Sequence, residues 1–117
     1  MKKLFVFFAL VFSLISLVGC SSVSQSYADK INKAASNKEH ITYEEVIKTL
    51  GDEAQDWTVT VLGSTNGVVY AVKGVTNPHE FKELLNSEEN VDCLIITIMN
   101  NKATAAKYGS TKDVEDK

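Results

Sequence analysis

The chain has 117 residues, with 12 lysines, no arginine and 15 acidic residues, which give a formal net charge of −3. A chain of this length holds one small domain, so a multidomain enzyme is excluded. Because an acidic surface repels the phosphate backbone of nucleic acids, we expect no nucleic-acid partner.

The N-terminal segment 1–19 has the pattern of a signal peptide. Two lysines precede a run of 15 mostly apolar residues, 4–18, which is shorter than the roughly 20 residues that a membrane-spanning helix needs. We therefore predict that segment 1–19 is removed. The mature chain from Cys20 then carries ten lysines against 15 acidic residues, a net charge of −5.

The end of this segment, Leu17, Val18 and Gly19 before Cys20, resembles the lipobox of bacterial lipoproteins. The resemblance implies that the Cys20 thiol takes a diacylglyceryl group and that signal peptidase II recognises Leu17, Val18 and Gly19 and cleaves before Cys20. Two acyl chains are enough for stable anchoring in a membrane. We therefore expect a protein that is bound to the cell membrane by lipid and faces outward. In a cell with two membranes, Ser21 after the cysteine implies the outer membrane.

The mature chain is predicted to contain one domain with a short segment at each end. The lipidated cysteine and a serine-rich flexible tether form residues 20–26. A single α+β domain follows over residues 27–109. Residues 110–117 are expected to be a charged, frayed tail.

Capping signals predict the helices. Apolar residues at helical spacing indicate a short first helix over 27–35. Thr42 and Glu45 form a capping box before a second helix over 43–50, which Gly51 ends. A third helix begins with asparagine at the N-cap and proline at the first position, and its buried face is expected to be Phe81, Leu84 and Leu85.

Two β-hairpins are predicted from runs of apolar and β-branched residues. Their strands are expected over residues 57–62, 68–73, 91–99 and 102–108. The Asn66-Gly67 pair, within the loop 63–67, marks the first turn, and Asn100-Asn101 marks the second. The apolar run at residues 94–96 predicts that the third strand is central and buried on both faces.

Shifted by 35 residues, the chain shows a weak internal repeat, with Thr42 superposed on Asn77. Either a duplicated αββ unit or two units that obey the same capping and turn rules would produce it. We predict the duplication, as a four-stranded antiparallel sheet with helices on one face. Trp57 is expected to point into the core, and Tyr70 and Tyr108 are the candidate residues of a binding surface on the open face.

The segment 41–51, ITYEEVIKTLG, resembles a helix of small bacterial lipoproteins with the fold of the beta-lactamase inhibitor protein and of the outer-membrane small-lipoprotein family. Segment 96–103 resembles their closing hairpin. The chain departs from their pattern in the helix at Pro78 and in Asn100-Asn101, where a glycine is usual. The resemblance implies a non-catalytic module that acts in envelope structure or binds an envelope or extracellular protein.

No residue pattern identifies a catalytic, metal or cofactor site. Cys93, in an apolar strand, is expected to be a buried and inert thiol. His79 and Glu83 share a helix face, as many exposed pairs do. The other polar residues considered, all expected to be solvated, are His40, Asp52, Glu53, Asp56 and Glu80.

We therefore expect a protein that is not an enzyme and has no cofactor and no metal. One alternative is a secreted inhibitor-like protein. Another is a small-ligand carrier, which needs a cavity of several hundred Å³. A third is a hydrolase, which needs His40, His79 and Cys93 to lie within about 10 Å of one another.

Overall fold

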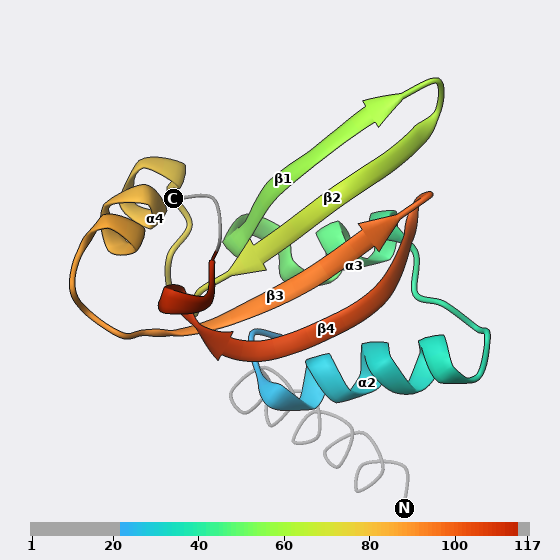
Figure 1. Ribbon diagram of the computed structural model, residues 1–117, viewed down its shortest axis with the longest axis horizontal. Helices are drawn as coiled ribbons and strands as arrows, with labels where there is room; N and C mark the ends of the chain where they lie inside the picture. The colour runs from blue at the N-terminus through green and yellow to red at the C-terminus, as the bar shows by residue number, and fades with distance from the viewer. Residues whose placement is uncertain (1–21, 115–117) are drawn as a thin grey trace, which may run out of the picture.

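The structure is a computed structural model that describes residues 22–114, and it is an α+β fold built on one antiparallel sheet (Figure 1). The strands lie in the order β1-β2-β3-β4, so β2 and β3 are central, as predicted for β3. The helices and strands are α2 (Gln25–Ser36), α3 (Tyr43–Leu50), β1 (Ala54–Val61), β2 (Ser64–Ala71), α4 (Pro78–Asn86), β3 (Asp92–Met99) and β4 (Lys102–Ser110). The predicted α+β class and the four-stranded antiparallel sheet are confirmed.

All three predicted helices are present, and side-chain caps explain where they begin. The Thr42 hydroxyl accepts a hydrogen bond from the Glu45 N–H (3.2 Å) at the start of α3. The Asn77 side chain accepts one from the His79 N–H (2.7 Å) at the start of α4. Each bond satisfies a backbone donor that has no partner inside the helix. α2 is longer than predicted because Ser24 caps it two residues earlier.

The first hairpin turns earlier than predicted. Its turn is Leu62-Gly63, where both residues have positive φ angles of 52° and 80°. This is the backbone of a two-residue hairpin turn, in which the twist of the turn matches the twist of the strands. Asn66 and Gly67 lie inside β2 instead. The second turn, Asn100-Asn101, is confirmed, with φ angles of 52° and 68°.

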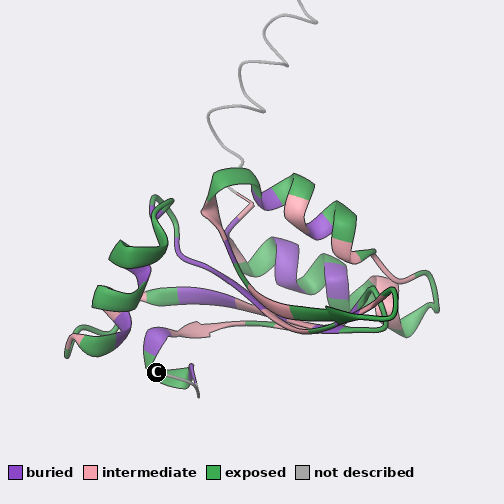
Figure 2. Ribbon diagram, turned by 90° about the horizontal axis from the view of Figure 1, so that it is seen from above, coloured by how far each residue is buried: buried purple, intermediate pink, exposed green. Residues whose placement is uncertain are grey.

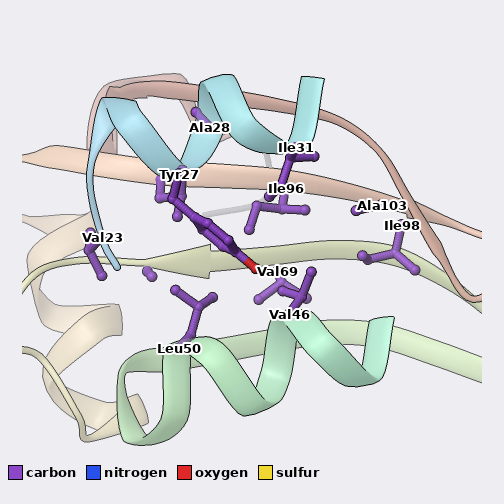
Figure 3. Close-up of a cluster of buried hydrophobic side chains, with 12 residues drawn as sticks. Val23, Tyr27, Ala28, Ile31, Val46, Leu50, Val69, Ile96, Ile98 and Ala103 are labelled. Carbon is purple, nitrogen blue, oxygen red and sulfur yellow. The ribbon is translucent and has the colours of Figure 1, made fainter. Parts of the chain in front are cut away.

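The sheet has a buried cluster on each face, so the expectation of helices on one face is wrong. α2 and α3 lie on the same side of the sheet (Figure 2) and enclose the first cluster with alternate strand residues (Figure 3). α4 covers the other face at one end of the sheet, with Phe81 and Leu85 in the second cluster. Alternation along β2 separates the two sets, because Val69 and Ala71 belong to the first cluster and Tyr70 to the second.

The internal repeat does not hold in three dimensions. The first residues of α3 and α4, Tyr43 and Pro78, are 35 positions apart, but the first turn residues, Leu62 and Asn100, are 38 apart. The two helices also pack on opposite faces of the sheet. Shared capping and turn rules account for the sequence similarity without an in-register duplication.

The folded part extends beyond the predicted domain at both ends. Val23 is 2% exposed and belongs to the first cluster, so residues 23–26 are not a flexible tether. At the other end, Thr111–Asp113 forms a short 3-10 helix, and Val114 is 2% exposed in the second cluster. The predicted tail therefore does not begin at residue 110. The predicted signal peptide, its cleavage site and Cys20 lie outside the described residues.

Candidate functional site

One half of the sheet face that carries α4 has no helix over it. α4 has nine residues, a length of about 13 Å, whereas an eight-residue strand such as β1 spans about 26 Å. α4 therefore covers only the end of this face that holds Trp57 and Tyr70. We call the uncovered half the open face, and its strand residues are Val59, Val61, Ser64, Asn66, Val68, Thr97, Met99, Lys102 and Ala105.

Apolar side chains on the open face are in contact with solvent. Val59 is 65% exposed, Val61 61% and Met99 57%. Leu62, at the turn between β1 and β2, is fully exposed. A small domain buries most of its large aliphatic side chains, so their collection at one end of one face is typical of a surface that meets another molecule.

The charge on this face differs in sign from that of the whole chain. On the strand positions of the face, including the half under α4, the charged residues are Lys102 and Lys107, and none is acidic. Lys107 forms an exposed ion pair with Asp113 (3.5 Å). The formal net charge of the chain is −3. The open face itself therefore combines apolar side chains with the single positive charge of Lys102 and would suit a partner that carries carboxylates beside an apolar centre.

Hydrogen bonds between the two turns hold the hairpin ends together. Asn101 accepts from the Thr65 N–H at Oδ1 (2.9 Å) and donates from Nδ2 to the Gly63 carbonyl (3.0 Å). The Asn100 side chain accepts from the Ser64 hydroxyl at Oδ1 (3.0 Å), and the Asn100 N–H donates to Oδ1 of Asn66 (2.8 Å). A glycine in the second turn would supply the positive φ but not these side-chain bonds. Asparagine is suited to both roles, which explains the Asn100-Asn101 pair.

A surface pocket of about 410 Å³ lies where α3 begins beside the two turns. It is lined by Thr42, Tyr43, Glu44, Gly63, Thr65 and Asn101. The Tyr43 hydroxyl donates to Asp56, and this bond and partial burial raise the pKa of Tyr43. Pockets for small organic ligands are lined mainly by hydrophobic and aromatic side chains, whereas Tyr43 is the one such side chain among these six residues, so the pocket is a weaker candidate site than the open face.

The two candidate tyrosines do not form one surface. Tyr70 is 5% exposed and lies under α4, where its ring packs against Trp57 (5.0 Å between centroids) and Phe81 (5.9 Å). Trp57 is half-buried against the same cluster, as predicted. Tyr108 is opposite Leu94 and packs against the first cluster, on the other face. The prediction that Tyr70 and Tyr108 share an open face is therefore wrong.

The candidate hydrolase residues do not converge. His40 precedes Ile41, whose carbonyl accepts a hydrogen bond from the Ala103 N–H. Ala103 is opposite Ile98 on β3. Cys93 is five residues away along the same strand, about 16 Å. His79 is on the exposed side of α4, where its Nε2 lies 3.3 Å from a Glu83 carboxylate oxygen. Within residues 22–114, no three histidine, cysteine or acidic side chains are grouped as a metal site would need.

Cys93 is fully buried in the second cluster. Burial raises the pKa of its thiol to about 11, because the thiolate would lose its hydration. The native pKa is above that of the unfolded chain, so this group stabilises the fold below about pH 9 and loses that effect as pH rises towards 11. The buried, inert thiol predicted from the sequence agrees with this environment.

Two of the three acidic residues after α3, Glu53 and Asp56, have structural partners. Glu53 accepts a hydrogen bond from the Gly74 N–H (2.7 Å), which connects the start of β1 to the loop before α4. Asp56 accepts from the Thr58 N–H (3.0 Å) and from the Tyr43 hydroxyl. Asp52 is exposed. The Glu53 and Asp56 carboxylates therefore point to different neighbours.

Comparison with protein-family models, with curated protein sequences and with solved structures found no match to this chain. The helices among the described residues are too short and too polar to cross a bilayer. The fold and the open face thus define the class of molecule: a small α+β domain in which helices leave one half of one sheet face uncovered. Val59, Val61 and Met99 were not predicted as surface residues. Alternation placed both valines on the same face as Trp57, which was expected to point into the core, and the sequence does not show that α4 covers only part of that face.

Proposed function

We propose that the protein is a lipid-anchored membrane protein that faces the outside of the cell and binds another protein through the open face. The observation that carries the binding role is the exposure of Val59, Val61 and Met99 on a sheet face that helices cover only in part. Exposed aliphatic side chains on a rigid sheet can be buried by a partner at little cost in conformational entropy. The proposal includes no catalytic step, cofactor or metal.

The N-terminal end of the domain supports an orientation relative to the membrane. Val23 is packed in the first cluster, on the side of α2 and α3. From Cys20 to Val23 the chain can span only about 10 Å. A lipid on Cys20 would therefore hold the domain against the membrane, with α2 near the bilayer. The open face is on the opposite side of the sheet and would be directed towards other envelope or extracellular proteins.

The chemistry of the open face defines the kind of partner. Its aliphatic centre matches an apolar patch on the partner, and Lys102 at the edge of the face matches carboxylates around that patch. The partner is therefore an envelope or extracellular protein with an acidic, partly apolar surface. A freely secreted inhibitor with the same face is the alternative if no lipid is attached.

The anchor is tested by replacing the residue that would carry the lipid. We expect the wild-type protein, expressed in a bacterial host, to sediment with membranes and to have the mass of the chain from Cys20 plus a diacylglyceryl group. Cys20→Ala should lack this added mass and should not be released by signal peptidase II. The matched control is Cys93→Ala, which removes the other cysteine and should stay anchored. A wild-type protein that is soluble and unmodified would contradict the anchor and favour the secreted alternative.

The binding face is tested with a photo-reactive residue at Met99 in the anchored protein. We expect a covalent adduct with an envelope protein, and we expect Val61→Glu to lower its yield by about tenfold, because a carboxylate repels an acidic partner and is costly to bury. The control probe is placed at Lys48, an exposed residue of α3 on the other side of the sheet. Equal yields from Met99 and Lys48, or no effect of Val61→Glu, would contradict the proposed face.

A further inference from the structure

The two outer edges of the sheet differ in how they are protected. At the β4 edge, Asn32 of α2 donates from Nδ2 to the Ala106 carbonyl (2.8 Å) and accepts from the Ala106 N–H at Oδ1 (2.9 Å). The Ala103 N–H donates to the Ile41 carbonyl (2.8 Å). The outward N–H of Ala103 and both outward backbone groups of Ala106 are thus occupied within the chain, so α2 and Ile41 prevent another strand from pairing along this part of the edge.

Among the described residues, the outer edge of β1 has backbone groups that no other segment uses. Because the turn has two residues, Val61 and Ser64 are a hydrogen-bonded pair, so Thr60 and then Thr58 direct their backbone groups away from β2. The Thr58 N–H agrees with this pattern, since it donates to Asp56 of its own strand. Among residues 22–114, no backbone hydrogen bond joins the outer edge of β1 to another segment. β1 is at the border of the sheet in Figure 1.

Most of the usual protections of an edge strand are absent from β1. It is paired with β2 over eight residues with no bulge. It contains no proline and no lysine, and its segment 57–61 carries no charge. Exposed edges of this kind pair readily with another strand. Asp56 is the exception, because its carboxylate occupies the Thr58 N–H.

The segment 57–61 is complementary to itself. Its sequence Trp-Thr-Val-Thr-Val reads with the same alternation in both directions from Val59. If two such segments run antiparallel with Val59 opposite Val59, Thr58 meets Thr60 on one face and Trp57 meets Val61 on the other. Threonine pairs and pairs of aromatic with β-branched residues both stabilise neighbouring antiparallel strands.

We propose that two copies of this chain pair through β1, antiparallel about a two-fold axis at Val59, and form one continuous eight-stranded sheet. The Thr58 N–H moves from Asp56 to the Thr60 carbonyl of the other copy, and each Thr60 N–H donates to a Thr58 carbonyl. Because β4 is closed by Asn32 and Ile41, each copy has one open edge, so pairing ends at a dimer and does not form a fibre. This inference stands independently of the lipid anchor and of the protein partner.

The test is disulfide formation in the chain from Ser21 to Lys117, which contains both buried clusters in full and lacks Cys20. Val59 would face Val59 in a pair with Cα atoms about 4.5 Å apart, within the range that a disulfide bridges. We expect Val59→Cys to oxidise rapidly to a covalent dimer. Val61→Cys is the matched control, because Val61 has nearly the same exposure but is four residues out of register with its copy. We expect its dimer yield to be at least about tenfold lower.

The noncovalent dimer is measured by sedimentation over a range of concentrations. Thr60→Pro removes an outward N–H that β2 does not use and the hydrogen bond between the Thr60 and Thr65 hydroxyls (2.7 Å). The backbone pairing with β2 is unchanged, so the monomer should lose some stability but keep its fold, while the dimer dissociation constant rises about tenfold or more. Asp56→Ala frees the Thr58 N–H and should lower that constant. A protein that stays monomeric throughout, equal oxidation of Val59→Cys and Val61→Cys, or a folded Thr60→Pro variant that still dimerises as wild type would each overturn the proposal.

Discussion

We expect Gly67→Ala to lower the free energy of unfolding by about 2–4 kcal/mol, the sum of backbone strain and steric overlap. Gly67 has a φ of +143°, which residues with a side chain rarely adopt. A Cβ there would lie 2.7 Å from the Thr58 Cα and 2.7 Å from the Trp57 carbonyl oxygen on the neighbouring strand. Both atoms belong to the backbone, so the hairpin itself must move. Urea denaturation followed by circular dichroism measures the change.

Gly63→Ala is the matched control for this prediction. Gly63 also has a positive φ, +80°, in the same hairpin, but nothing lies within 4 Å of the position that its Cβ would take. Gly63→Ala should therefore lower the free energy of unfolding only by the strain of a left-handed residue, about 1 kcal/mol. If the two variants lost equal stability, the close approach of β1 and β2 at Gly67 would not be the cause.

Phe81→Ala should cost about 3–5 kcal/mol, the range for removing a buried aromatic ring from a core. Phe81 is fully buried and, with Leu85, packs α4 against the sheet. Its ring centroid lies 5.8 Å from that of Trp57 and 5.9 Å from that of Tyr70. Thermal unfolding measures the loss. Trp57 is the only tryptophan of the chain, so a red shift of its native fluorescence would report the opened cluster directly.

Two other substitutions in α4 separate ring packing from helix stability. Phe81→Leu keeps most of the apolar volume and should recover more than half of the loss. Leu84→Ala, at a half-buried position of the same helix, should cost about 1–2 kcal/mol, because less apolar surface leaves contact. A Phe81→Ala variant with wild-type stability and unchanged fluorescence would show that α4 does not hold this face of the sheet.

The helices could be predicted from the sequence because their signals are local. The Thr42 cap with Glu45, and the Asn77 cap before Pro78, each define a helix start by groups within three residues of one another. Local hydrogen bonds of this kind form in the same way whatever the rest of the fold does. The observed starts of α3 and α4 agree with these signals.

The first hairpin shows why turns are harder to predict. Asn66-Gly67 is a strong turn signal, but the chain turns at Leu62-Gly63 and uses both residues elsewhere. Asn66 accepts a hydrogen bond from Asn100, 34 residues away, and Gly67 permits the close approach of β1. These roles depend on long-range contacts, which a pattern of neighbouring residues does not contain.

The candidate site could be predicted only in part, for a related reason. Alternation correctly placed Val59 and Val61 on the same face as Trp57. Whether that face is covered depends on the length of α4 and on the face to which it packs, and both are properties of the tertiary structure. Tyr70 was expected on an open face, but the loop after β2 brings α4 back over it.

The bond between Asn32 and Ala106 joins the beginning of the domain to its last strand, 74 residues later in the chain. Among the elements of residues 22–114, α2 leaves the ribosome first, yet the strand against which it packs, β4, is the last strand. The first cluster therefore cannot close until nearly the whole chain is available, because long-range contacts must wait for both partners. If the chain is exported N-terminus first, the first cluster cannot form before the final residues emerge, so the chain can pass through a narrow channel without unfolding it. The domain would then complete its fold on the far side of the membrane.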